Sequence, residues 1–281
     1  MNDLTPALER LASDSPGHYG VTVRDVASGR SFVWHADEGF PSASIIKLPI
    51  MAEVYRQAHL RLLSLGDNVW VTPEDIASGS GVLHLFTPNL QLQVRDLVEL
   101  MICVSDNTAT NMLLDRVGIR HVNEYMEVLG LKHTRVYNNL QVFPIPRTGV
   151  NQTSPSDMVE LLARIATGNV VSGWACHRMI DTLKRQQFND IIPGHLPIEQ
   201  PSTIGGRPTI EVAHKSGWYS GVRGDVGLIY HGSRCLAVAV LGRDLTNDET
   251  SSGVLSRMAR LLYDWGMSSE VDDTNPDQAS D

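Results

Sequence analysis

Residues 209–242 read TIEVAHKSGWYSGVRGDVGLIYHGSRCLAVAVLG, and this stretch decides the fold class. It contains three runs with the composition of strands, Thr209–Lys215, Asp225–His231 and Cys235–Gly242. The segments between the runs are short and carry glycine and serine, so they leave no room for a crossover helix. We therefore predict that neighbouring strands are joined by hairpins and pair antiparallel.

The rest of the chain places a long helical block between these strands and an earlier pair. Tyr19–Val26 and Ser31–His35 are predicted strands joined by a turn, and residues 5–12 form a short predicted helix. Helical spacing of apolar residues continues over Ser44–Leu63, Val94–Val104, Asn107–Val117, Arg120–Leu129, Pro155–Thr167, Gly173–Arg185 and Glu249–Trp265. The order predicts an α+β fold: an antiparallel sheet lobe flanked by N- and C-terminal helices, with an inserted all-helical lobe.

The composition fits one large domain of two lobes. The chain has 281 residues, of which 42% are hydrophobic and 20% are charged. We expect a single domain over 1–267, with the sheet lobe at about 1–43 and 205–267 and the helical lobe at about 44–204. The polar segment 268–281 is an expected disordered acidic tail.

Charge and hydropathy exclude several classes of partner. The net charge is −9, and without the five acids of the tail it is −4, so the body lacks the basic face of a nucleic-acid-binding protein. No apolar run is long enough to span a membrane, and no signal peptide is visible. As written, the sequence predicts a cytoplasmic protein, or a periplasmic or secreted one if a leader was removed. We expect a monomer that acts on a small molecule.

Cysteine and histidine spacing predicts neither disulfides nor a metal site. The three cysteines, Cys103, Cys176 and Cys235, are far apart and odd in number, so we expect buried or partly buried thiols. No cluster of His, Cys and Asp has ligand spacing, and we therefore expect no metal and no cofactor.

Ser44-Ile-Ile-Lys47 is the first candidate for chemistry. It lies where a loop gives way to a helix, and positions i and i+3 share a helix face, so Lys47 is expected beside the Ser44 hydroxyl. A buried lysine has a lowered pKa and can accept the serine proton. Pro49 is expected to bend this helix. Taken alone, the same four residues are explained by a helix cap and a surface charge.

Two further triplets follow in order. Ser105-Asp106-Asn107 lies 61 residues after Ser44 and begins a predicted helix, where capping is the ordinary explanation. Lys215-Ser216-Gly217 lies 110 residues beyond Ser105, at the end of a predicted strand. The three motifs together are typical of class A β-lactamases and penicillin-binding proteins. With the segments around them, the chain resembles this family over residues 5–266.

The resemblance implies a role for each matched residue. Ser44 would be the acylated nucleophile, Lys47 its general base, and Ser105 the donor of a proton to the leaving nitrogen. Asn107 would bind the substrate's side-chain amide, Asp106 would hold the loop, and the backbone N–H groups of Ser44 and Trp218 would form the oxyanion hole. The substrate carboxylate would be bound by residues of the third motif and its neighbours, Lys215, Ser216, Gly217 and Arg223, although a surface arginine is an equal alternative for the last.

Three positions qualify the resemblance. His214 precedes Lys215 in a strand, so it points to the opposite face and is expected in the core rather than in the cleft. Trp218 is larger than the residue that many relatives carry, and it should narrow the cleft or offer a stacking face. From Val128 to Ser156 there is no Asp or Glu, whereas class A β-lactamases carry an omega-loop glutamate that activates the deacylating water. Gln141, Asn151 or Gln152 could instead orient a water, but an amide is a poor base.

The sequence therefore predicts a serine hydrolase of class A β-lactamase type that opens β-lactams or related amides and esters through an acyl-Ser44 intermediate. Deacylation is expected to be slow. A D-Ala-D-Ala peptidase or an esterase with the same residues is the alternative enzyme. A covalent β-lactam sensor or trap is the alternative from another class, and a degenerate structural module is the third choice.

Overall fold

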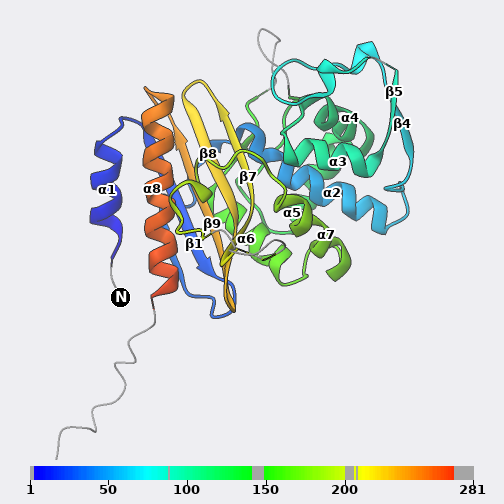
Figure 1. The fold of residues 1–281 in the computed structure, drawn as a ribbon. Helices are drawn as coiled ribbons and strands as arrows, with labels where there is room; N and C mark the ends of the chain where they lie inside the picture. The colour runs from blue at the N-terminus through cyan, green and yellow to red at the C-terminus, as the bar shows by residue number, and fades with distance from the viewer. Residues whose placement is uncertain (1–2, 88, 141–148, 200–205, 207, 269–281) are drawn as a thin grey trace, which may run out of the picture.

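The computed structural model describes residues 3–87, 89–140, 149–199, 206 and 208–268 (Figure 1). It is an α+β fold, as predicted, built on a five-stranded antiparallel sheet in the order β2-β1-β9-β8-β7. The strands are β1 (His18–Asp25), β2 (Ser31–Trp34), β7 (Ile210–Tyr219), β8 (Val222–His231) and β9 (Arg234–Arg243). The first pair of strands thus completes the sheet that the last three strands begin.

Helices cover both faces of this sheet. On one face lie α1 (Thr5–Ser13) and α8 (Asp248–Met267), and on the other lies α6 (Pro155–Ala166), which packs against β9, β1 and β8 (Figure 1). The remaining helices form the block beyond α6. They are α2 (Lys47–His59), α3 (Val94–Cys103), α4 (Asn107–Val117), α5 (Ile119–Val128) and α7 (Gly173–Leu183).

Two short two-stranded ribbons lie outside the main sheet. The strands β4 (Asn68–Val71) and β5 (Leu90–Gln93) form one, and β3 (Phe40–Pro41) and β6 (Gln152–Thr153) form the other. Neither ribbon was predicted, because strands of two to four residues carry too little alternation to be recognised. The second ribbon matters for the site, since β3 leads directly to Ser44.

Alternation along β9 divides the core in two. Val238 and Val240 belong to the apolar cluster shared with α1 and α8, whereas Ala237 and Ala239 belong to the cluster shared with α6 and the helical block. Side chains of successive strand residues point to opposite faces, so one strand serves both cores. The small alanines allow α6 to approach the sheet closely.

Strands β7 and β8 are longer than predicted, which corrects the expected ends of both strands. Lys215 lies in the middle of β7 rather than at its end, and Arg223 lies within β8, directly opposite Trp218. Glycines and serines masked the strand pattern here. The hairpin closes at Gly221, whose φ of 77° is the left-handed conformation that glycine tolerates.

The three cysteines are free thiols, with Cys176 buried and the other two partly buried, as expected. Burial raises the pKa of Cys103 and of Cys235 to about 11. In the described part of the chain, no helix is both long and apolar enough to cross a membrane. The lobe boundaries stay a prediction, and the predicted tail lies outside the described residues from 269 onward.

We predict that Ala239→Leu lowers the free energy of unfolding by about 1–3 kcal/mol, because extra methyl groups must fit between β9 and α6. Urea unfolding measures this change. The control is Ser233→Leu at the exposed β8–β9 turn. Equal stability of the two variants would mean that α6 does not pack tightly on this face.

Candidate active site

A cleft of about 460 Å³ lies where β7 meets the helical block. Of the residues that the sequence singled out, Ser44, Asn107, Asn151 and Trp218 line it. Four others are buried to 1% exposure or less: Lys47, Ser105, Lys215 and Ser216. The three motifs thus meet around one cleft, although they are far apart in the sequence.

Ser44 lies in a 3₁₀ turn, Ala43–Ile46, that runs directly into α2. The sequence had placed this serine at the start of the α-helix itself. Pro49 explains the difference, because it has no N–H to donate to the carbonyl of Ile45, and the α-helical ladder therefore starts after the serine. In a 3₁₀ turn, positions i and i+3 eclipse, so Ser44 and the following Lys47 remain on one side.

Lys47 is the most constrained side chain of the site. Its Nζ donates to the carbonyl of Ser105 at 2.6 Å, to Ser105 Oγ at 2.9 Å and to Asn107 Oδ1 at 2.9 Å. Burial, and next the positive charge of Lys215, hold the pKa of Lys47 well below its usual value, while Asp106 opposes this shift. A lowered pKa gives the neutral amine a larger population near pH 7.

The second motif is held by an unusual backbone. Ser105 has a φ of 55°, a left-handed conformation that is rare outside glycine and that turns this residue toward Lys47. The buried Asp106 carboxylate caps α4 by accepting from Ala109 N at 2.9 Å, and it also accepts from Val82 N and Leu83 N. Asp106 therefore ties α4 to the 78–83 loop.

Gly217 brings β7 against the serine. A Cβ at this position would lie 2.7 Å from Ser44 N and 2.9 Å from Ile45 N, which no side chain can satisfy without moving the backbone. The glycine of the third motif thus allows the strand to touch the turn that carries Ser44. The next residue, Trp218, is 39% exposed and packs edge-on against Phe188, with ring centroids 4.9 Å apart.

The other two residues of the third motif lie behind the cleft wall. Lys215 Nζ donates to the carbonyl of Ser216 at 2.6 Å, and Gln186 Nε2 donates to Ser216 Oγ at 2.9 Å. Burial lowers the pKa of Lys215 to about 7, although the Asp225 carboxylate opposes this shift. The Ser216 hydroxyl, which accepts from Gln186, can still donate its own proton to a substrate carboxylate.

His214 and Arg223 are not among the described residues that line the cleft. His214 is buried, its Nδ1 lies 2.9 Å from Asp225 Oδ2, and its Nε2 lies 3.0 Å from Asn189 Oδ1. It is therefore a core histidine, as strand alternation predicted. The guanidinium of Arg223 lies 3.9 Å from the Asp190 carboxylate.

The structure adds cleft residues that the sequence did not single out, among them Leu140, Ser80 and Tyr219. Leu140 is held by Asn111 of α4, whose Oδ1 accepts from Leu140 N at 2.7 Å and whose Nδ2 donates to Leu140 O at 2.8 Å. Asn111 lies four residues after Asn107 on the same face of α4, and that spacing could have predicted from the sequence that Asn111 lies near the cleft.

The expected water-positioning amides have other partners or are not described. Asn151 Oδ1 accepts from Tyr137 N and Asn138 N, and its Nδ2 donates to Asn138 O. Gln152 pairs with Pro41 in the β3–β6 ribbon, and Gln141 lies outside the described residues. Asn151 thus fixes the backbone of Tyr137 and Asn138 at the cleft wall.

Comparisons with known proteins identify relatives of this chain. The model of the Beta-lactamase enzyme family matches residues 3–265. Beta-lactamase L2 of Stenotrophomonas maltophilia is 31% identical over 180 residues, which cover 62% of this chain and 58% of that enzyme's length. A crystal structure of a beta-lactamase from Sphaerobacter thermophilus DSM 20745 superposes with a TM-score of 0.86 at 28% identity, covering 94% of this chain and 98% of that one.

A second solved structure that is similar to this chain is a covalent complex with an antibiotic. PBP-A, in a leucine-to-glutamate mutant described as an acyl-enzyme complex with penicillin G, superposes with a TM-score of 0.82 at 29% identity. The match covers 93% of this chain and 95% of that one.

The lowered pKa of Lys215 predicts a pH-dependent stability. Between about pH 7 and the ordinary lysine value of 10.5, the unfolded chain holds a proton that the folded chain has lost, so stability rises with pH across this window and falls as pH drops toward 7. Urea unfolding at several pH values should show that Lys215→Met removes a slope of up to about 1.4 kcal/mol per pH unit. If the free energy of unfolding changed with pH in the same way in the wild type and in Lys215→Met, the prediction would be contradicted.

Proposed function

The chain belongs to the β-lactamase enzyme family, and we propose that it is a serine hydrolase that opens β-lactams, or related amides and esters with a carboxylate, through an acyl-Ser44 intermediate. The observation that carries the proposal is the buried Lys47 amine, which contacts Ser105 and Asn107 immediately behind a cleft lined by Ser44. A lysine in a dry site with three acceptors is costly as a structural element, and its lowered pKa suits a base.

Acylation follows from these positions. Neutral Lys47 takes the proton of the Ser44 hydroxyl as Oγ attacks the carbonyl carbon and the carbonyl oxygen becomes an oxyanion. The backbone N–H groups of Ser44 and Trp218, which the Gly217 contact brings close, are the proposed donors to that oxyanion. The tetrahedral intermediate then collapses, the carbon–nitrogen bond breaks, and the acyl group stays on Ser44.

The leaving nitrogen needs a proton, and Ser105 is the proposed carrier. Its Oγ accepts from Lys47 Nζ at 2.9 Å, so the proton taken from Ser44 can pass through Lys47 and Ser105 to the nitrogen. Lys215 and Ser216, with Arg223 as a further candidate, are the proposed partners of the substrate carboxylate. Protonated Lys215 supplies positive charge near the cleft, where a desolvated carboxylate needs it.

Deacylation is proposed to be slow because none of the described residues that line the cleft is an aspartate or a glutamate. Leu140, which Asn111 holds by two hydrogen bonds, lines the same cleft as Ser44 and Asn107, and a leucine cannot activate water. The stretch from Val128 to Ser156 carries no Asp or Glu to replace it. Lys47 is then the remaining base, as it would be in a peptidase-like cycle.

The apolar side chain of Leu140 at the cleft also supports the second candidate function, a covalent β-lactam sensor or trap that stays acylated. We expect a long-lived acyl-enzyme both with β-lactams and with related amides or esters. The lifetime of the adduct decides between a β-lactamase and a trap, whereas cleavage of acyl-D-Ala-D-Ala peptides or small esters would support the peptidase or esterase alternative.

We predict that penicillin G or a chromogenic cephalosporin adds a single covalent mass to the protein, that colour develops slowly, and that Ser44→Ala removes the adduct. Intact-protein mass spectrometry, recorded together with absorbance, measures all three. Ser13→Ala, at an exposed position of α1, is the control and should label like the wild type. Rapid colour with a mass that returns to its starting value would contradict slow deacylation, and absence of any adduct would contradict the β-lactam proposal.

A second prediction concerns Leu140. Leu140→Glu should shorten the lifetime of the acyl-enzyme by at least about tenfold, because general-base catalysis by a positioned carboxylate contributes typically 10²–10⁴-fold. The matched control is Leu140→Gln, which has a similar size but cannot take a proton from water. Adduct decay is followed by mass spectrometry after removal of free penicillin. Equal lifetimes for the two variants would show that position 140 does not reach the attacking water.

A further inference from the structure

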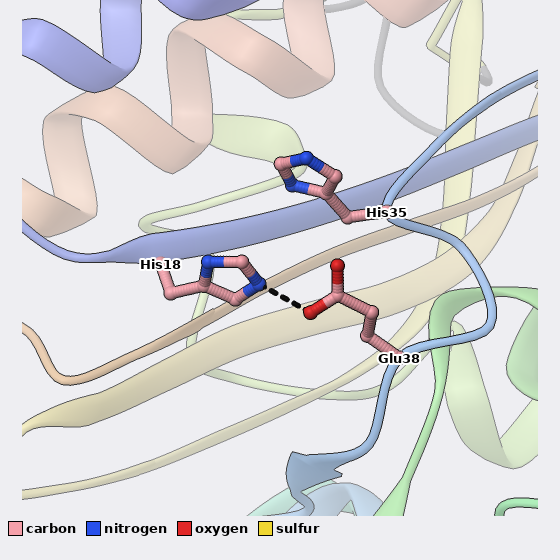
Figure 2. Close-up of side chains that lie close together, drawn as sticks. All are labelled: His18, His35 and Glu38. Atoms are coloured by element: carbon pink, nitrogen blue, oxygen red, sulfur yellow. Dashed lines mark hydrogen bonds and ion pairs between the residues drawn. The ribbon is translucent and has the colours of Figure 1, made fainter.

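Two histidines and a glutamate lie close together at the start of β1, outside the cleft. His18 begins β1, and His35 and Glu38 lie in the segment that joins β2 to β3; Figure 2 shows His18 and Glu38 facing one another with the His35 ring beside them. One ligand-type atom from each residue lies within 4.8 Å of the other two. His18 is partly buried, and the other two residues are exposed, so an ion from solvent can reach them.

The rings are oriented by stacking. The His18 and His35 rings stack with centroids 5.0 Å apart and planes inclined by 12°, His18 also stacks on Phe40, and Trp34 stacks on His35. His35 has a φ of 50°, which turns its side chain back toward β1. The cluster is therefore held by its neighbours rather than by the exposed segment alone.

The hydrogen bonds of the cluster determine which nitrogens can bind a metal. His35 Nδ1 lies 2.8 Å from the Tyr19 carbonyl, which can only accept, so Nδ1 carries the proton and Nε2 of the neutral ring keeps its lone pair. Metal-bound histidines typically donate their second N–H to a carbonyl in this way. His18 Nε2 lies 2.6 Å from Glu38 Oε2 and shares a proton with it.

We propose that His18, His35 and Glu38 bind a divalent transition-metal ion, with Zn²⁺ as the best match, at a surface site separate from the serine cleft. Two imidazoles and one carboxylate form a common zinc donor set, and water would complete a tetrahedral site. The ion takes the place of the proton between His18 and Glu38, and that proton leaves to the other ring nitrogen or to water.

Binding requires a small rearrangement of the cluster. Zn–N bonds of about 2.0–2.1 Å place two ligand atoms of a tetrahedral site about 3.4 Å apart. The His18 and Glu38 atoms, now 2.6 Å apart, must separate, and the His35 ring must tilt out of its stack. Exposed side chains on a connecting segment can make such movements without disturbing the sheet.

Arg243 is the charge that competes with the metal. It lies opposite His18 in the β1–β9 register, and its Nη2 is 3.6 Å from Glu38 Oε2. Its Nη1 also lies 3.0 Å from Asp244 Oδ2, which can hold the guanidinium when Glu38 turns to an ion. Neutralising Arg243 should therefore strengthen metal binding, which mere disorder of the cluster would not do.

The position of the site suggests what the ion would do. Glu38 lies two residues before β3, and β3 leads through Ser42 to Ser44. An ion that joins Glu38 and His35 to His18 would fasten this segment to β1 and stabilise the folded chain by mass action. The proposal does not depend on acylation of Ser44.

The test is calorimetric titration of the intact chain with ZnCl₂ near pH 7.5, where histidine is mostly neutral, in a buffer that does not bind zinc. We expect one site per chain with a micromolar Kd. His35→Gln and Glu38→Gln should each weaken binding at least tenfold, and Arg243→Gln should tighten it about threefold or more. Tetrahedral Co²⁺ absorption reports the coordination, and zinc should raise the Tm of the wild type but not that of His35→Gln.

The matched control is His177→Gln, since His177 and Asp181 form another exposed histidine–carboxylate pair, 3.4 Å apart. This variant should bind zinc like the wild type. Absence of a single site, or equal weakening by His177→Gln and His35→Gln, would overturn the proposal. Wild-type acylation by penicillin G, measured in the same preparation with and without chelator, keeps this outcome separate from the proposed function.

Discussion

The arrangement of the site depends on the burial of one amine. Lys47 has no exposed surface, and its Nζ has acceptors on a different part of the chain, Ser105 and Asn107 at the start of α4. Removing an ammonium from water costs several kcal/mol unless its protons are bonded, and the cost falls when the amine is neutral. The same burial that makes a charged Lys47 costly therefore lowers its pKa and populates the neutral amine, which is the form that the proposed proton transfer from Ser44 requires.

The sheet supports this amine from the other side. Strand β7 touches the turn that carries Ser44, and it can do so only because Gly217 has no side chain. Lys215, two residues earlier, adds a second buried cation whose charge lowers the pKa of Lys47 further. Asp225, across the β7–β8 hairpin, limits the loss of charge at Lys215. The two lysines are thus linked electrostatically, although one lies in helix α2 and the other in strand β7.

The two halves of the proposed reaction rest on different residues. Acylation draws on groups in the 3₁₀ turn and α2, on Ser105 and Asn107 where α4 begins, and on β7. Deacylation depends on what the segment after α5 presents at position 140, where the backbone is fixed by Asn111 but the side chain is apolar. In the proposed reaction, a change at position 140 would therefore alter the release of the acyl group and leave its formation largely unaffected.

The sequence by itself determined the fold class, the order of the helices and of the five strands of the main sheet, and the three motifs, because these depend on local periodicity and on short spacings. Helix α4 was predicted with its observed ends because Asp106 caps it and glycine follows it. The sequence also predicted that His214 would be buried, since strand alternation is a local rule.

Tertiary structure decided the rest. Only the packing of β7 against the 3₁₀ turn shows why the third motif needs glycine, and only the fold shows that Leu140 lies at the cleft or that Gln186 holds Ser216. The spacing of residues in the sequence did not reveal the His18, His35 and Glu38 cluster, because His18 begins β1 whereas the other two lie in the segment after β2. Continuing the β1–β2 register, in which Val21 faces Trp34, would have placed residue 37 opposite residue 18. Contacts between distant segments are set by how whole elements pack, and local patterns do not contain that information.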